Sequence, residues 1–433
     1  MFHRVSGSCI AAGLFLVILV ICATSAVKAQ NAKPDDGSAL RLIAPDGAAS
    51  HAPLSQVIEG GSERVASTSR QASARALPIR APDADEGNGD VEKSAEKALP
   101  PLELRSRIAT VLDRYENRPL NSGENSPWQV MHRIVAYGVE TQIEVGRPGG
   151  VHQSAIGWLL FNQPFRGQRL LVARNNSVYG KEGRGLQGHG GQLLAILAQS
   201  KLQRDYPIRV GEQEFSVEDL IRSEQRTCRA RTELTFKLIG LAHYLPSDTT
   251  WKSDDGQAWS IERLVREEIS QRIQGGTCGG THRLMGLTYA VVRRKQQGLE
   301  LTGDFARAAT YINEYIDYAL KLRNPDGSFS TSFLEHRAMN PDLSVRLRTT
   351  GHILEWLAFA VSDDTLRDPE IVESVEYLTQ ILEQSPNRNW EVGPLGHALH
   401  ALALYQQRVW GKPQPRRETA SHEDADTSLD RTR

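Results

Sequence analysis

A short phrase recurs six times along this 433-residue chain. Each copy places a large residue two and five positions after its first residue, and the position after the second is small. The copies begin at His132, Gln192, Phe236, His282, His352 and His397. Recurrence of an apolar helical pattern indicates a duplicated helical unit that buries its apolar face against neighbouring copies. The repeat therefore predicts a fold built from six related helices.

Helices of a second kind alternate with the repeated ones. Residues 215–221 are echoed by residues 259–265, 44 residues later, which is close to the spacing of the repeated helices on either side. These alternate segments are amphipathic and charged on one face, as surface helices are, and no β alternation of useful length appears. The sequence predicts an all-α (α/α)6 toroid, with six apolar inner helices and outer partners near 102–116, within 151–168, and near 216–225, 260–274, 304–323 and 368–384.

Composition divides the chain into a folded part and flanking segments. Residues 1–29 have the basic start, short apolar run and small-residue end of a secretory signal, and the apolar run is too short to favour a membrane span. Residues 30–99 and 412–433 have little apolar content and are predicted to be a disordered spacer and tail. Residues 100–411 form the predicted toroid domain. The signal predicts that the protein is exported and is periplasmic or extracellular. Contact with the membrane would require the signal to stay uncleaved.

The pattern resembles the toroids of the terpenoid cyclase and protein prenyltransferase superfamily. The run Asn324-Pro325-Asp326-Gly327-Ser328-Phe329-Ser330 is similar to their Asp-Gly-Ser-aromatic turn, and residues 255–260 form a looser copy. In that superfamily such turns fasten neighbouring helix pairs together. The resemblance implies a toroidal architecture and gives these residues a structural role.

The catalytic motifs of that superfamily are missing. The chain has no Asp-x-Asp-Asp run, with which squalene-type cyclases protonate their substrate. Prenyltransferases hold zinc with Asp-x-Cys and a later His, whereas Gly276 stands two residues before Cys278 here. The Gly-Cys-Gly-Glu-Gln run of thioester-forming toroids is also absent. The resemblance therefore carries none of these three activities to this chain.

Histidine is concentrated at the first position of the repeat. Four of the six copies begin with histidine, and His189 lies just before a fifth, in a chain with only 12 His. In a toroid these positions fall on one rim, where neutral imidazoles serve as acid–base groups or metal ligands. A structural hydrogen bond copied by duplication is the alternative. No short-range ligand spacing marks a metal site, so no cofactor is predicted, although the ring geometry would bring three histidines together around an ion.

Other candidate residues follow from the same rim. The predicted catalytic residues are His282, His352, His397 and Glu355, with the carboxylate one turn into the fifth repeated helix. A long loop is predicted from Asn324 to Gly351, and loops of this length often form binding walls. The predicted ligand-binding residues are His132, His189, Gln192, Arg346, Arg348 and Trp390. A solvated loop whose arginines pair with acidic neighbours is the alternative interpretation of Arg346 and Arg348.

Two cysteines remain after removal of the signal, Cys228 and Cys278, and both precede adjacent repeated helices. In an oxidising compartment two such cysteines more often pair than stay free, so a disulfide is predicted. A thiolate nucleophile at Cys278, one turn before His282, is the alternative.

Two function classes remain open from the sequence. One is a non-catalytic module that binds a peptide, glycan or small molecule at the rim. The other is an enzyme acting on an extracellular or envelope polymer such as a glycan, with rim His and Glu as acid and base. The near-zero net charge of −1 and the absence of a basic stripe disfavour nucleic acid as a partner.

Overall fold

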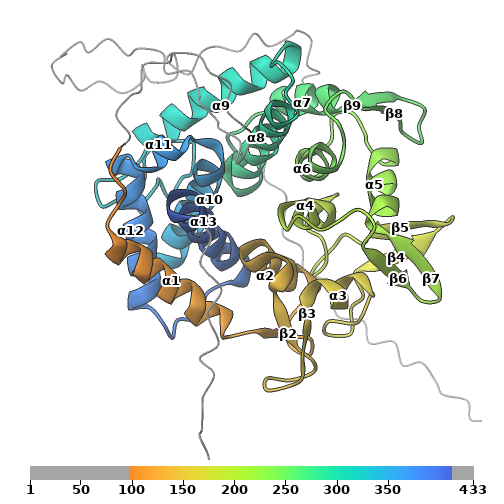
Figure 1. Ribbon diagram of the computed structural model, residues 1–433, viewed down its shortest axis with the longest axis horizontal. Helices are drawn as coiled ribbons and strands as arrows, with labels where there is room; N and C mark the ends of the chain where they lie inside the picture. Colours follow the sequence, from red (N-terminus) through yellow and green to blue (C-terminus); the bar gives the residue numbers. More distant parts are fainter. Residues whose placement is uncertain (1–96, 412–433) are drawn as a thin grey trace, which may run out of the picture. The chain divides into compact units, whose positions relative to one another are not determined.

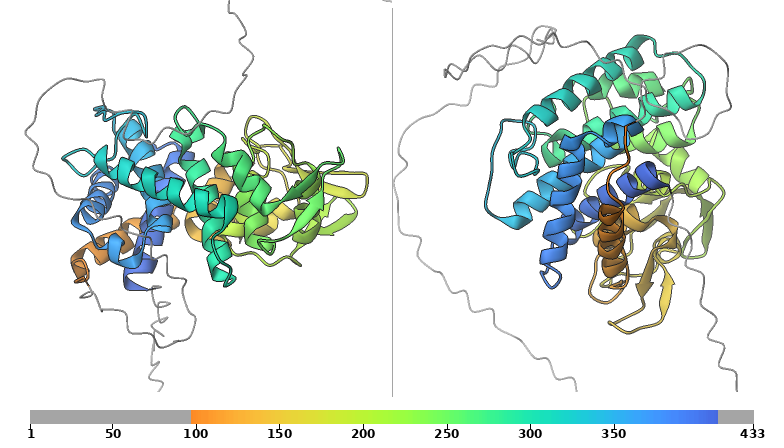
Figure 2. Two further views of the ribbon diagram at one scale, coloured as in Figure 1. Left: turned by 90° about the horizontal axis from the view of Figure 1, so that it is seen from above. Right: turned by 60° about the vertical axis from the view of Figure 1, so that its left-hand side comes forward.

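The computed structural model describes residues 97–411. The predicted signal, nearly all of the predicted spacer and the predicted tail lie outside the described residues. The described part is mostly helical with little sheet (Figures 1 and 2). Within it, no helix combines the length and the apolar character that crossing a membrane requires.

Thirteen α-helices lie within residues 97–411. They are α1 (Leu102–Glu116), α2 (Pro127–Tyr137), α3 (Ala155–Leu160), α4 (Gln192–Gln199), α5 (Val217–Arg226), α6 (Thr235–Tyr244), α7 (Ile261–Ile269), α8 (Thr281–Gln296), α9 (Gly303–Lys321), α10 (Leu343–Ala360), α11 (Asp363–Leu366), α12 (Pro369–Gln384) and α13 (Val392–Trp410). Two short 3-10 turns, η2 (Gly138–Glu140) and η3 (Thr277–Gly280), precede β2 and α8.

The six repeated segments form six helices that contact one another in cyclic order. α2 contacts α4, α4 contacts α6, α6 contacts α8, α8 contacts α10, α10 contacts α13, and α13 contacts α2 again (Figure 1). Nearly every residue of α4 and of the first three turns of α8 is buried, as expected of helices surrounded by others. The prediction of a mostly helical fold is confirmed.

Glycines let the repeated helices approach closely. A Cβ added at Gly240 of α6 would lie 2.7 Å from Leu194 Cγ of α4. A Cβ at Gly396 of α13 would lie 2.4 Å from the carbonyl oxygen of His132 on α2, at the contact that completes the cycle. Both distances are shorter than van der Waals contact, so any larger residue would push the helices apart.

The alternate segments also form helices. α1, α5, α7, α9 and α12 match the predicted partners to within a few residues, whereas the segment within 151–168 yields only the six-residue α3. Sequence signals fix several starts: the backbone N–H of Ser216 donates to Asp219 Oδ2 at 2.9 Å at the start of α5, and Pro369 occupies the first turn of α12.

Short strands, which the sequence analysis did not predict, occur beside these helices. They are β1 (Leu120–Asn121), β2 (Gln142–Glu144), β3 (His152–Ser154), β4 (Leu171–Arg174), β5 (Ser177–Gly180), β6 (Pro207–Val210), β7 (Gln213–Ser216), β8 (Thr250–Lys252) and β9 (Ala258–Ser260). The first three form one small sheet, and the rest form three antiparallel hairpins. Strands of two to four residues are too short to produce a recognisable alternation.

The predicted loop from Asn324 to Gly351 is wrong at its C-terminal boundary, because the loop ends before Gly351. α10 begins at Leu343, capped by the carboxylate of Asp342, which accepts from Ser344 N at 2.8 Å. His352 therefore lies in the middle of α10, and His132 and His397 likewise lie about a turn inside α2 and α13. The repeat marks a packing position, which is at the first or second residue of α4, α6 and α8 but a turn or more inside α2, α10 and α13.

The turn at residues 324–330 fastens two helices to each other. The hydroxyl of Thr350 on α10 accepts a hydrogen bond from Phe329 N at 3.2 Å. Gly327 has a positive φ of 89° and lies against the backbone of α12, where an added Cβ would meet Glu373 O at 2.7 Å. These contacts give the turn a structural role between α10 and α12.

Candidate functional site

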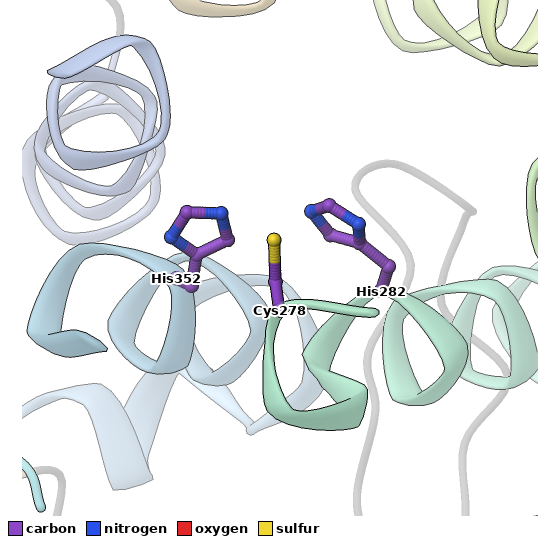
Figure 3. Close-up of side chains that lie close together, drawn as sticks. All are labelled: Cys278, His282 and His352. Carbon is purple, nitrogen blue, oxygen red and sulfur yellow. The ribbon is translucent and has the colours of Figure 1, made fainter. Parts of the chain in front are cut away.

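Three potential metal ligands meet where η3 and α8 approach α10. They are Cys278 of η3, His282 of α8 and His352 of α10, and one donor atom from each lies within 4.8 Å of the others. Figure 3 shows the Cys278 sulfur between the two imidazoles, all three side chains projecting from the helices toward the same space. Both histidines are buried, and Cys278 is partly exposed.

Two further histidines complete a compact group with these two, which we call the histidine cluster (His132, His282, His352 and His397). The ring centroids of His352 and His397 are 4.0 Å apart, and those of His282 lie 5.3 Å from His352 and 5.1 Å from His397. His132 joins through His397 at 5.3 Å. The predicted convergence of the repeat's first positions is therefore present, on four of the six helices.

Acceptor oxygens fix the tautomer of most of these imidazoles. Nδ1 of His132 bonds to Trp128 O and Nδ1 of His352 to Arg348 O, both at 2.7 Å. Nδ1 of His397 bonds to the Glu355 carboxylate at 2.7 Å. Because carbonyl and carboxylate oxygens only accept, Nδ1 carries the proton and Nε2 keeps its lone pair in the neutral ring.

His282 differs from the others because neither of its ring nitrogens has a partner. Both Nδ1 and Nε2 are buried without a hydrogen bond. Burying a polar group without a partner costs about 1–3 kcal/mol, so such groups are rare in native structures. An orphaned imidazole that faces the lone pairs of other imidazoles would be satisfied by a cation or by a water molecule.

Three of the four histidines, His132, His282 and His352, are held in their neutral form. Burial, reinforced by the mutual repulsion of the rings, lowers the pKa of His282 and of His352 well below the ordinary value of 6.5. Burial lowers the pKa of His132 to about 3. Neutral imidazoles are the form that coordinates metal ions.

Two carboxylates support the histidines from outside the cluster. Glu355 is buried and accepts from Nδ1 of both His397 and His400, at 2.7 and 2.6 Å. Burial opposes its ionisation, but the positive potential and hydrogen bonds of those two histidines outweigh burial and lower the pKa of Glu355 well below 4.5. A carboxylate–histidine pair of this kind orients the imidazole and raises its basicity as a ligand.

The second carboxylate, Glu233, lies at the more open edge of the cluster. It accepts from His189 Nδ1 at 2.7 Å and from Thr277 Oγ1 at 3.0 Å, and His189 lies 6.5 Å from His282 by ring centroids. Burial opposes ionisation of Glu233, but the hydrogen bonds from His189 and Thr277 lower its pKa overall. His189 and Glu233 are each partly exposed, unlike the cluster itself.

The backbone that carries Cys278 has an unusual conformation. Cys278 has φ 50° and ψ 45°, and both glycines that follow it also have positive φ. A left-handed conformation is uncommon for a residue with a side chain, and such residues concentrate at functional sites. Burial and the nearby charge of Glu355 raise the pKa of the Cys278 thiol to about 12, so the free thiol is protonated at neutral pH.

A small cavity opens beside the cluster. Its volume is about 20 Å3, and its walls include His132, His282, His397, Gln192 and Phe236. A water molecule needs a volume of roughly 10–15 Å3, so the cavity holds a water or an ion and not a sugar ring or a peptide.

Neither a protein-family model nor a curated protein matches this sequence. The site must therefore be interpreted from its own geometry.

Several predicted site residues lie elsewhere or are occupied. Arg346 forms an ion pair with Asp326 and lies over the Tyr377 ring at 4.9 Å, so it fastens the 324–330 turn. Trp390 is buried and donates to Tyr115 Oη at 3.1 Å, away from the cluster. Both side chains have structural partners, and ligand binding by Arg346 and Trp390 stays a prediction.

The remaining predicted binding residues stay near the cluster. Gln192 is buried at the start of α4, lines the cavity and accepts from Gly188 N at 2.8 Å, which leaves its amide N–H groups for a ligand. Arg348 is exposed, and its guanidinium makes no hydrogen bond or ion pair with the rest of residues 97–411. Its charge acts on Cys278, which places it close to the donor atoms.

The predicted disulfide is absent, because both cysteines are free. Cys228 is fully buried behind α5 and directs its Sγ toward Glu224 O at 3.4 Å, whereas Cys278 faces the histidines. The two thiols therefore lie in different environments, although they precede adjacent repeated helices.

Proposed function

We propose that the described chain is an (α/α)6 toroid that binds one transition-metal ion of the zinc class through Cys278, His282 and His352. The cyclic contacts of α2, α4, α6, α8, α10 and α13, each with an alternate helix against it, support the toroid. The observation that carries the metal site is the convergence of three donor atoms within 4.8 Å, one of them on an imidazole without any partner.

The chemistry of the donor set selects the class of ion. One sulfur and two imidazole nitrogens suit zinc, copper or cobalt, whereas calcium and magnesium require oxygen ligands. In a tetrahedral zinc site, bonds of about 2.0–2.3 Å place donors about 3.3–3.6 Å apart. The observed 4.8 Å limit requires only small side-chain rotations for the three donors to close on an ion.

The surroundings of the donors favour an ion as well. Nδ1 of His352 donates to Arg348 O, which leaves Nε2 available for a metal, and ligating histidines usually have such a partner. Among the described residues no group donates a hydrogen bond into the cluster.

The cavity beside the cluster is too small for the peptide or glycan ligand that the sequence suggested. Its volume of about 20 Å3 admits one small species, and of the three proposed metal ligands only His282 lines it. A longer ligand would have to lie outside the cluster, near Arg348. We further propose that residues 1–29 direct export, which would be visible as a mature chain beginning at Gln30 in N-terminal sequencing of the secreted protein.

Metal binding is tested by titrating the untagged, reduced protein with Co2+ and then displacing the cobalt with Zn2+. We expect one ion per chain, with the visible bands of tetrahedral cobalt and a near-ultraviolet band from thiolate coordination. Cys278→Ser is expected to abolish the thiolate band and to weaken zinc binding by at least about tenfold. Cys228→Ser is the matched control, because the Cys228 thiol lies outside the site, and it should leave both unchanged.

His282→Gln should also weaken binding while leaving the far-ultraviolet circular dichroism intact. Equal cobalt spectra for the parent and Cys278→Ser would contradict the proposed donor set. A chain that binds no cobalt or zinc under reducing conditions would overturn the function itself.

A second candidate function, metal-assisted hydrolysis, is favoured by the pair His189–Glu233 beside the donors. Three protein ligands leave a fourth position open for water or substrate, which is typical of catalytic zinc sites. His189, held by Glu233 at 2.7 Å and partly exposed, would accept a proton from the attacking water. The test is hydrolysis of small ester and phosphoester substrates by the zinc-loaded protein. Activity that survives in His189→Asn would contradict this role, whereas metal binding should persist in that variant.

A further inference from the structure

A second cavity lies on the outer side of α2, apart from the histidine cluster. Its volume is about 260 Å3, and it is lined by residues from the end of α1, from α2, from η2 and from the β2–β3 sheet. Pockets for drug-sized ligands measure about 300–1,000 Å3, so this cavity suits a molecule of the size of an amino acid.

The cavity contains a buried cation without an anionic partner. Arg133 is only 6% exposed. Of its five N–H donors, one bonds to Arg118 O at 3.3 Å, and the guanidinium lies 4.6 Å from the Tyr137 ring. Among the described residues, no carboxylate lies within ion-pair distance of it. Burial lowers the pKa of Arg133, and the electrostatic effects of Tyr137 and Glu116 offset this only in part.

Buried charges in proteins are normally paired, because an isolated buried ion is costly. The guanidinium presents a planar fork of donors that matches a carboxylate. The ligand that would complete this site therefore carries a carboxylate at Arg133.

The same cavity also has two carboxylates in its lining. Glu116 and Glu140 both line it and are both exposed. Glu116 is also the last residue of α1, where free carbonyl groups give a helix end its partial negative charge. These carboxylates favour an ammonium group over a second anion.

We propose that this cavity binds a small α-amino acid or a similar aminocarboxylate, with its carboxylate at Arg133 and its ammonium group toward Glu116 and Glu140. The charge pattern selects a zwitterion, and the volume excludes a peptide chain or an oligosaccharide as the buried part. The site is independent of the metal ions discussed above, because none of its lining residues belongs to the histidine cluster.

The proposal is tested by screening the twenty common amino acids for thermal stabilisation of the metal-free protein, followed by calorimetry of the best ligand. We expect at least one to bind, and its N-acetyl and carboxamide derivatives to bind at least about tenfold more weakly. Arg133→Met should remove binding, whereas Arg147→Met, which changes an exposed arginine of the neighbouring loop, should not.

A second variant separates the charge argument from any folding defect of Arg133→Met. The double variant Glu116→Gln/Glu140→Gln alters exposed residues only, and it should lower the affinity for the free amino acid to that for its N-acetyl form. Absence of binding by every amino acid would overturn the proposal. Equal binding of the free and N-acetylated ligands, or unchanged binding by Arg133→Met, would overturn it as well.

Discussion

Glu268 of α7 fastens the starts of two repeated helices, and its loss should be among the more damaging single changes. Its side chain is fully buried and pairs with Arg283 of α8, whose side chain is 9% exposed, at 3.0 Å. It also accepts from Leu234 N at 2.8 Å, at the entry to α6. Glu268→Gln keeps the shape of the residue but removes the charge that compensates Arg283.

Removing one partner of a buried ion pair typically costs 3–5 kcal/mol, roughly, because the other charge stays buried. At about 2.1 cal/mol/K per residue, a folded part of about 315 residues has an unfolding entropy near 0.7 kcal/mol/K. The expected loss therefore corresponds to a fall in Tm of roughly 5–8 °C. Arg283 also donates to Gln271 Oε1 at 2.9 Å, which favours the lower end of this range.

The assay is thermal unfolding of the full chain followed by far-ultraviolet circular dichroism, with urea unfolding as a second measure. Glu214→Gln is the matched control, because it removes one partner of an ion pair whose side chains are 57% and 72% exposed. Exposed pairs contribute about 1 kcal/mol or less, so this change should move Tm by no more than about 2 °C. Equal shifts in the two variants would refute the argument from burial.

Three further changes test other parts of the structure. Burial lowers the pKa of His243 to about 4 in the folded protein, below the unfolded value of 6.5, so its contribution to stability is complete above pH 6.5 and is lost as pH falls toward 4. As pH falls from 6.5 to 4, the parent protein should therefore lose up to about 3 kcal/mol of unfolding free energy that His243→Phe retains, as measured by urea unfolding. Identical pH profiles for the two proteins would contradict this. Gly396→Ala should lower the unfolding free energy by about 1–3 kcal/mol, because the new Cβ meets the His132 carbonyl; an unchanged urea midpoint would show that α13 and α2 separate easily. Trp390→Phe should lower the unfolding free energy by about 1 kcal/mol, because it removes the hydrogen bond to Tyr115, and it should leave the zinc affinity unchanged. Weaker zinc binding by this variant would show that Trp390 contributes to the site.

The repeat predicted the helices and the histidine cluster because duplication preserves packing positions. His282, His352 and His397 are far apart in the chain but occupy equivalent positions, so their convergence followed from the cyclic arrangement alone. The same pattern misplaced the start of α10, because a helix can begin well before the residue that contacts its neighbours.

Other features of the site left no usable signal in the sequence. Glu233 meets His189 across 44 residues and Glu355 meets His400 across 45, and such pairs depend on how whole helices are placed. The separation of Cys228 from Cys278 depends on the direction of each side chain at its loop, which the repeat does not specify. The left-handed backbone at Cys278 had one indirect sign, the pair of glycines after it.

The proposed function depends on coordination of one metal ion by Cys278, His282 and His352. X-ray absorption spectroscopy of the zinc-loaded, untagged protein, together with elemental analysis of its zinc content, measures this coordination. We expect one zinc per chain, with one sulfur at about 2.3 Å and at least two imidazole nitrogens at about 2.0–2.1 Å. A coordination shell made only of oxygen, or a shell unchanged in Cys278→Ser, would rule out the proposed donor set.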